Sequence, residues 1–96
     1  MIAHRYLPFA REELNEAASF YEARVPGLGA ACLDDVDRSI EMMCANPRIG
    51  AVAGRTFRKV LVRRFPYSII YALRDEELVI VAIAHQRKRP GYWRGR

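Results

Sequence analysis

Residues able to bind or cleave a phosphate ester are concentrated in the second half of the sequence. Basic side chains form three clusters there, Arg58-Lys59, Arg63-Arg64 and Arg87-Lys88-Arg89, and Arg94 and Arg96 follow. His85, Tyr92 and Trp93 stand beside the last cluster. Guanidinium groups bind phosphates through two hydrogen bonds and aromatic rings stack on nucleobases. The combination therefore predicts a surface that binds nucleic acid or another anionic target.

Three of these residues have the chemistry that phosphodiester cleavage requires. The reaction needs one group to deprotonate the 2′-hydroxyl, another to protonate the leaving oxygen, and cations to stabilise the charge on phosphorus. His85 is the candidate acid or base because an imidazole exchanges its proton near neutral pH, and Lys59 and Arg87 are the candidate cations. The residues predicted to bind the target are Arg58, Arg63, Arg64, Arg89, Trp93 and Arg94. Because no metal-ligand spacing is present, we expect neither a metal nor another cofactor.

Each of these features also has a purely structural interpretation. His85 can end a buried strand with its ring hydrogen-bonded, and Tyr92 and Trp93 can fold back to close the edge of the core. The arginines can form a solvated face. Their clustering without acidic neighbours favours a binding surface over that last interpretation.

The distribution of charge supports a binding surface. The net charge is +5, but residues 1–45 carry four basic and eight acidic side chains, whereas residues 46–96 carry twelve basic and three acidic ones. No acidic residue occurs between Asn46 and Leu73 or from Val79 onward. Since a solubilising surface normally mixes charges of both signs, the asymmetry favours contact with an anionic partner.

Hydrophobic periodicity predicts two helices after a short strand at residues 2–7. Pro8 suits a helix start, where its missing N–H costs nothing. Apolar residues then recur on one helical face over residues 9–24 and again over residues 30–45, and Asn46-Pro47 ends the second helix. The intervening loop at residues 25–29 is short, so we expect an antiparallel helical hairpin.

Three strands are predicted in the remainder, at residues 57–65, 67–73 and 78–84, with a loop at 48–55 and a polar turn at 74–77. The last strand is almost entirely apolar, as expected at the centre of a sheet. The predicted fold is therefore α+β, with the order β-α-α-β-β-β and the helical hairpin packed on one face of an antiparallel sheet.

Length and composition indicate one domain over residues 1–96. The sequence begins without the basic and apolar segments of a signal peptide, and its longest apolar run, residues 78–84, is too short to cross a bilayer. Cys32 and Cys44 fall on one predicted helix roughly 18 Å apart, too far for a disulfide. We therefore expect a cytoplasmic protein with reduced thiols and no membrane partner.

Two long stretches, residues 57–71 (FRKVLVRRFPYSIIY) and residues 81–93 (VAIAHQRKRPGYW), resemble the C-terminal half of the RelE/ParE superfamily. These proteins are toxins of bacterial type II toxin–antitoxin systems and include plasmid stabilisation proteins. Residues 40–50 resemble the end of the family's second helix, and the first helix fits as well. The resemblance covers nearly the full length, and the fold that it implies agrees with the one predicted above.

The resemblance implies a toxin that arrests growth and is neutralised by an antitoxin encoded beside it. The RelE-like branch cleaves mRNA on the ribosome with scattered basic residues and a C-terminal tyrosine. Lys59, Arg87 and Tyr92 fall near such positions, which makes Tyr92 a fourth candidate catalytic residue.

The ParE-like branch instead inhibits DNA gyrase and is not a hydrolase. Ser68 and Leu61 replace basic residues of the RelE-like pattern, and the His85-Gln86 pair is closer to the ParE-like one. Ribosome-bound mRNA and gyrase therefore both stay open as targets. The competing hypothesis is a non-toxic module that binds nucleic acid or another protein, which a basic surface alone would satisfy.

Overall fold

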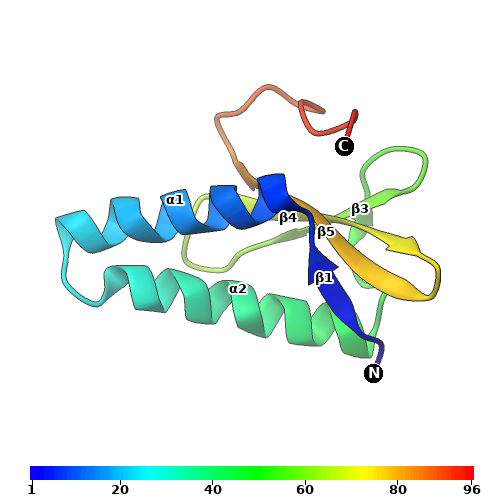
Figure 1. Ribbon diagram of the computed structural model, residues 1–96, viewed down its shortest axis with the longest axis horizontal. Coiled ribbons are helices and arrows are strands. Elements are labelled where there is room, and N and C mark those ends of the chain that lie inside the picture. The colour runs from blue at the N-terminus through cyan, green and yellow to red at the C-terminus, as the bar shows by residue number, and fades with distance from the viewer.

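The computed structural model describes residues 1–96, and its elements follow the chain in the order β1-α1-α2-β2-β3-β4-β5 (Figure 1). The helices are α1 (Pro8–Arg24) and α2 (Leu28–Ala45). The strands are β1 (His4–Tyr6), β2 (Ala51–Val52), β3 (Phe57–Leu61), β4 (Tyr67–Arg74) and β5 (Glu77–His85). Together the strands form one sheet in the order β1-β5-β4-β3-β2.

The predicted α+β order is confirmed, but the sheet has one additional strand and, contrary to the prediction, is not antiparallel throughout. A two-residue strand, β2, lies within the loop expected at residues 48–55 and pairs antiparallel with β3. At the opposite edge β1 pairs with β5 in parallel, so the sheet is mixed. β3, β4 and β5 are antiparallel because short turns join them. No such turn fixes the direction of β1, whose partner lies far along the chain.

The helical hairpin packs closely because α2 has a small residue in its first turn. Gly29 is buried in the first turn of α2, and a Cβ placed there would lie 2.6 Å from the carbonyl oxygen of Ala18 on α1. The Glu22 carboxylate accepts hydrogen bonds from the N–H groups of Gly27 and Gly29, at 2.9 and 3.0 Å. These donors would otherwise be unpaired at the helix start. α2 therefore begins two residues earlier than predicted.

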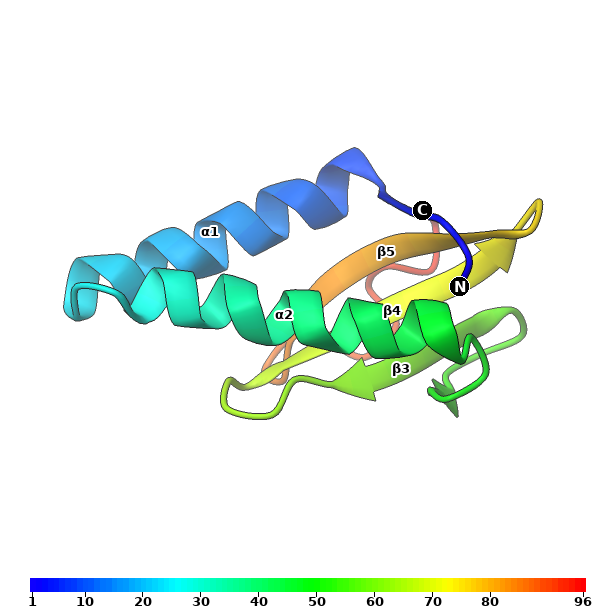
Figure 2. The same ribbon diagram turned by 90° about the horizontal axis from the view of Figure 1, so that it is seen from below.

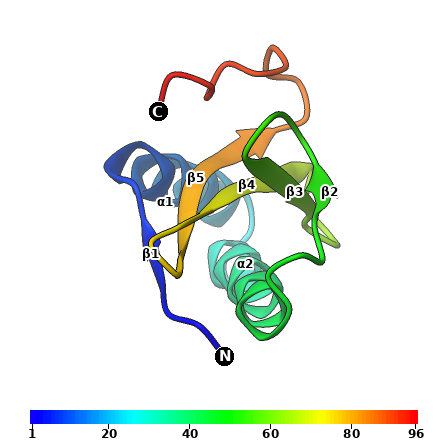
Figure 3. The same cartoon turned by 90° about the vertical axis from the view of Figure 1, so that its right-hand side faces the viewer.

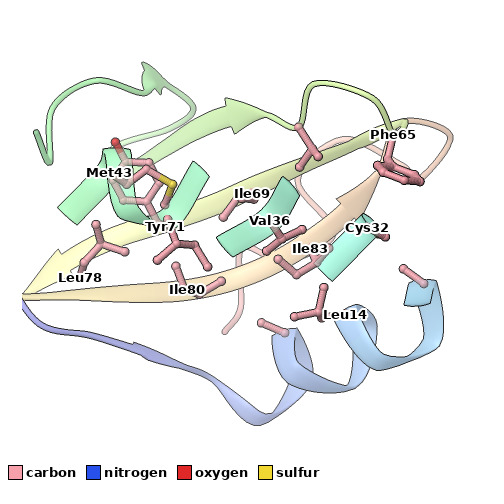
Figure 4. Packing of buried hydrophobic residues seen from close by; sticks show 14 of the residues in the cluster. Leu14, Cys32, Val36, Met43, Phe65, Ile69, Tyr71, Leu78, Ile80 and Ile83 are labelled. Carbon is pink, nitrogen blue, oxygen red and sulfur yellow. The ribbon is translucent and has the colours of Figure 1, made fainter. Parts of the chain in front are cut away.

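The main core lies between the hairpin and the sheet (Figures 2 and 4). Leu14 of α1, Val36 and Met43 of α2, and Ile69, Tyr71, Leu78, Ile80 and Ile83 of the sheet meet there. Cys32 and Cys44 are free and buried in the same layer. Neither α1 nor α2 has the length and apolar character that a membrane-spanning helix requires.

A second apolar layer lies on the other face of the sheet, which the segment at residues 86–96 covers (Figure 3). Val79, Val81 and Ala82 of β5 contribute to it, and Trp93 closes it. The almost entirely apolar sequence of β5 follows from this arrangement, because both faces of the strand are covered. The register between β4 and β5 shifts at Ile70/Tyr71, so Val81 and Ala82 both face this outer layer.

Candidate functional site: a basic cavity on the outer face of the sheet

A cavity of about 390 Å³ lies on the outer face of the sheet, beneath the segment at residues 86–96. Its floor includes Ser68 of β4 and Ala84 of β5, which are paired neighbours. Both side chains are small, so the floor is hollow where larger residues would fill it. The volume falls within the range of small-ligand pockets, about 300–1,000 Å³.

Four cationic side chains line this cavity and no carboxylate does: they are Lys59, Lys88, Arg89 and Arg94. Lys59 comes from β3, and the other three come from the segment after β5. β4 separates β3 from β5, so Lys59 meets the cations of the C-terminal segment across an intervening strand. The cavity therefore concentrates positive charge at one place, where it attracts anionic groups.

Of the ten candidate residues, six line the cavity: Lys59, His85, Arg89, Tyr92, Trp93 and Arg94. Arg87 is exposed outside it, while its backbone N–H donates to Nδ1 of His85. Arg58 donates to the carbonyl oxygens of Arg48 and Gly50, at 3.3 and 2.8 Å, and so fastens the loop that follows α2. The structure thus places Arg58 in a structural contact and keeps Arg87 away from the cavity.

Arg63 and Arg64 lie in another region, beside α2. Arg63 lines a groove with Leu61 and with Asp35 and Met42 of α2. Arg64 forms a two-pronged ion pair with Asp35, at 2.9 Å from Nε to Oδ2 and 2.8 Å from Nη2 to Oδ1. The Asp35 side chain is only 5% exposed, so this pair ties the β3–β4 loop to the helix.

The Asp35–Arg64 pair predicts a loss of stability in acid. Hydrogen bonds from Arg64 hold the pKa of Asp35 below its ordinary value against the opposing effect of burial, and the charges of Arg64 and Arg38 contribute. A carboxyl with a lowered folded-state pKa stabilises the fold above its unfolded pKa, about 3.9, and loses this contribution as pH falls through the folded value. Arg64→Ala should therefore destabilise the protein strongly at pH 7 and much less at pH 2.

Urea unfolding at both pH values checks this prediction, with Arg63→Ala as the matched control. The control removes a neighbouring exposed arginine that lacks this hydrogen-bonded ion pair, so its effect should be small at both pH values. An equal cost of Arg64→Ala at pH 7 and pH 2 would contradict the role of ionised Asp35.

His85 stands between the basic cavity and a smaller hollow beside α1. Its ring packs edge-on against Tyr67, with centroids 5.0 Å apart. Its Nδ1 accepts the Arg87 N–H at 3.0 Å, which leaves the proton of the neutral ring on Nε2. Glu13 and Glu16 line the smaller hollow together with His85. α1 therefore supplies carboxylates to a hollow that His85 also lines, although the basic stretches of sequence contain none.

Tyr92 and Trp93 are both engaged in holding the C-terminal segment to the fold. The Tyr92 hydroxyl donates to Oε2 of Glu13 at 2.6 Å. Burial raises the pKa of Tyr92 well above its ordinary value, and the hydrogen bond to Glu13 and the charge of this carboxylate raise it further. The Trp93 ring is 6% exposed and packs edge-on against Phe57, with centroids 4.8 Å apart. These contacts match the interpretation in which both residues close the edge of the core.

Sequence reasoning gave Glu13 no role at the site and counted Arg96 only as one of the basic residues after the last cluster, although both residues shape the site. The Glu13 carboxylate accepts hydrogen bonds from the side chains of Tyr92 and Arg96 and from the backbone N–H of Ile83. Its sequence signal was obscured, because an acidic residue near a helix start is accounted for by the helix dipole. Ser68 was noted only for replacing a basic residue, whereas its small side chain helps to form the cavity floor.

Comparisons with known proteins agree with this fold and extend the resemblance seen in the sequence. The sequence model of the ParE toxin of type II toxin–antitoxin systems (parDE) matches residues 5–90. A chain of a solved structure described as the chromosomal ParDE toxin–antitoxin system from P. aeruginosa superimposes with a TM-score of 0.77 at 17% sequence identity. The match covers 88% of this chain and 96% of the other. No curated protein sequence is significantly similar to the chain.

The fold and the family match together define a toxin of the RelE/ParE superfamily. Within that class, the chain belongs to the ParE toxin family of type II toxin–antitoxin systems.

Proposed function

We propose that this toxin arrests growth through the basic cavity beneath its C-terminal segment and that a cognate antitoxin neutralises it. The observation that carries the proposal is the gathering of Lys59, Lys88, Arg89 and Arg94 around one hollow without a lining carboxylate. A concave site with charges of one sign raises the local concentration of oppositely charged partners. The target is therefore an anionic surface.

Inhibition of DNA gyrase without hydrolysis is the mechanism that the geometry supports best. A hydrolase would need its acid, base and cations within reach of one phosphate. The four candidate catalytic residues do not meet this requirement, because Arg87 lies outside the cavity and the Tyr92 hydroxyl is held by Glu13. Membership of the ParE toxin family favours the same mechanism.

Ribosome-dependent mRNA cleavage is the second candidate, and one observation favours it. Lys59 and His85 line the same cavity, so a cation and an imidazole can face one ligand there. Because Nδ1 of His85 is occupied by the Arg87 N–H, Nε2 is the atom that would exchange a proton with substrate.

The antitoxin is the partner that the family assignment supports. The similar solved structure from P. aeruginosa is described as a ParDE toxin–antitoxin system. With twelve basic and three acidic residues in its second half, this chain suits an acidic or amphipathic partner segment. Such a segment would neutralise the toxin by covering its basic surface.

Induction of the protein alone in a bacterial host, followed by two assays on the same culture, tests these proposals. We expect growth arrest, altered plasmid supercoiling and intact mRNA in primer extension. Lys59→Ala combined with Arg89→Ala should abolish the arrest, because it removes two of the four cavity cations. Arg48→Ala, which removes an exposed arginine outside the cavity, should leave it intact.

The other outcomes are equally distinct. New 5′ ends within translated codons, lost in the double variant, would replace gyrase inhibition with mRNA cleavage. Growth arrest that persists in a folded double variant would exclude the cavity as the toxic surface. Absence of arrest by the unaltered protein would favour the non-toxic binding module.

A further inference from the structure

Glu13 makes more hydrogen bonds to distant parts of the chain than its place on a surface helix would suggest. Its Oε1 accepts from the Ile83 N–H at 3.1 Å and from Nη1 of Arg96 at 2.8 Å. Its Oε2 accepts from the Tyr92 hydroxyl at 2.6 Å and from Nη2 of Arg96 at 3.1 Å. The side chains of Arg96 and Glu13 are only 16% and 18% exposed. One carboxylate thus joins α1, β5 and the C-terminal segment.

The position of Glu13 is set by an edge of the sheet that has no strand beside it. β1 pairs with β5 only over Leu78–Ile80, so β5 continues beyond its neighbour. In this part of the strand the Ile83 N–H donates to Glu13, and the Val81 carbonyl accepts from Nη1 of Arg96 at 3.1 Å. The Glu13–Arg96 pair therefore supplies the hydrogen bonds that another strand would have made.

This same pair anchors the wall of the basic cavity. Lys88, Arg89 and Arg94 belong to the segment that runs from β5 to Arg96. The segment is held at its far end by Arg96 and in between by Tyr92, and both bind Glu13. The chain end lies beside the beginning of α1 in Figures 1, 2 and 3. Without Glu13, the Tyr92 hydroxyl and the Arg96 guanidinium would lose a charged acceptor in a poorly solvated place.

We propose that Glu13 is a positioning residue of this toxin: it holds the C-terminal segment on the sheet, so that three of the four cavity cations face the hollow above Ser68 and Ala84. The inference rests on the proposed toxic role of the cavity, since its functional consequence is the assembly of that surface. Glu13 acts through Tyr92 and Arg96 and lies outside the cavity lining.

The sequence offers a direct reporter of this role, because Trp93 is its only tryptophan and lies in the anchored segment. Glu13→Ala should shift the Trp93 emission to longer wavelength and increase its quenching by acrylamide. Because residues 87–89 are already exposed in the unaltered protein, loosening of the segment should make trypsin cleave there faster. The variant should also keep the helical circular dichroism signal and abolish growth arrest. Glu12→Ala is the matched control, since Glu12 is an exposed carboxylate in the same helical turn, and all these properties should match those of the unaltered protein.

Arg96→Ala is a second variant, which breaks the same ion pair by removing the partner of Glu13. It should reproduce the Trp93 shift and the tryptic sensitivity, so it carries the test if Glu13→Ala fails to fold. Glu13→Gln keeps one acceptor oxygen, which can still accept the Ile83 N–H, but it places a donor NH2 group opposite the Tyr92 hydroxyl and removes the ion pair with Arg96. This variant should fall between the alanine variant and the unaltered protein.

The fluorescence and toxicity results separate the two proposals. If folded Glu13→Ala and Arg96→Ala match the unaltered protein in Trp93 emission and in the rate of tryptic cleavage, the positioning role is overturned, whether or not growth arrest is lost. If Trp93 is released but growth arrest is undiminished, Glu13 does anchor the segment, but the toxic surface lies elsewhere. That result would reject the functional part of both proposals.

Discussion

Replacement of Trp93 by alanine should lower the free energy of unfolding by about 3–5 kcal/mol, the usual cost of truncating a large buried aromatic side chain. The ring is 6% exposed and closes the outer apolar layer against Phe57. Its loss would uncover Ile70, Ala72 and the outward-facing residues of β5 to water. Urea denaturation followed by far-ultraviolet circular dichroism measures the effect without needing the tryptophan.

Trp93→Phe is the matched control, because a phenylalanine ring keeps part of the apolar contact and the edge-on packing with Phe57. Its cost should be clearly smaller than that of the alanine variant. If Trp93 instead served mainly to stack on a nucleobase, Trp93→Ala would leave the unfolding curve unchanged. The experiment thus decides between the two interpretations that the sequence allows for this residue.

Tyr71→Ala should destabilise the protein by a similar amount, about 3–5 kcal/mol. The Tyr71 side chain is fully buried between β4 and α2 (Figure 4). Its hydroxyl donates to the Pro47 carbonyl at 2.8 Å and accepts the Gly50 N–H at 3.0 Å. One residue therefore fills the core and also fixes the loop that leads from α2 to β2.

Tyr71→Phe separates these two contributions, since it keeps the ring and removes only the hydroxyl. The Gly50 N–H would then be buried without a partner, which costs about 1–3 kcal/mol. Chemical denaturation of the three proteins side by side measures both steps. A phenylalanine variant as stable as the unaltered protein would show that water readily replaces the hydroxyl and that the loop does not depend on it.

Much of the fold was predictable because local patterns dominate it. The helical period around Leu14 and Val36, the stop at Asn46-Pro47 and the apolar run from Leu78 determine three elements without knowledge of distant contacts. The parallel pairing of β1 was not predictable in this way, because His4 and Leu78 meet only in the folded chain. The start of α2 was placed too late because Gly29 usually signals a loop, whereas here it allows close contact with Ala18.

The candidate site shows the same division between local pattern and tertiary contact. Clustering in the sequence pointed to a region of positive charge, but it did not place the individual residues: Lys59 lines the cavity while its neighbour Arg58 contacts the loop after α2. Arg89 likewise lines the cavity while Arg87 does not. Partners that are distant in sequence decided the individual roles: Asp35 engages Arg64, and Glu13 engages Tyr92. The local sequence around each of these residues does not identify its distant partner.

The contact between Glu13 and Arg96 also has a consequence for synthesis of the protein. Its partners are separated by 83 positions, and the chain leaves the ribosome from its N-terminal end, so Glu13 emerges long before Arg96. The helical hairpin and the β4–β5 hairpin are local structures that form early, whereas contacts across nearly the whole chain close late. We therefore expect the nascent polypeptide to be harmless until Arg96 has left the ribosome and can pair with Glu13.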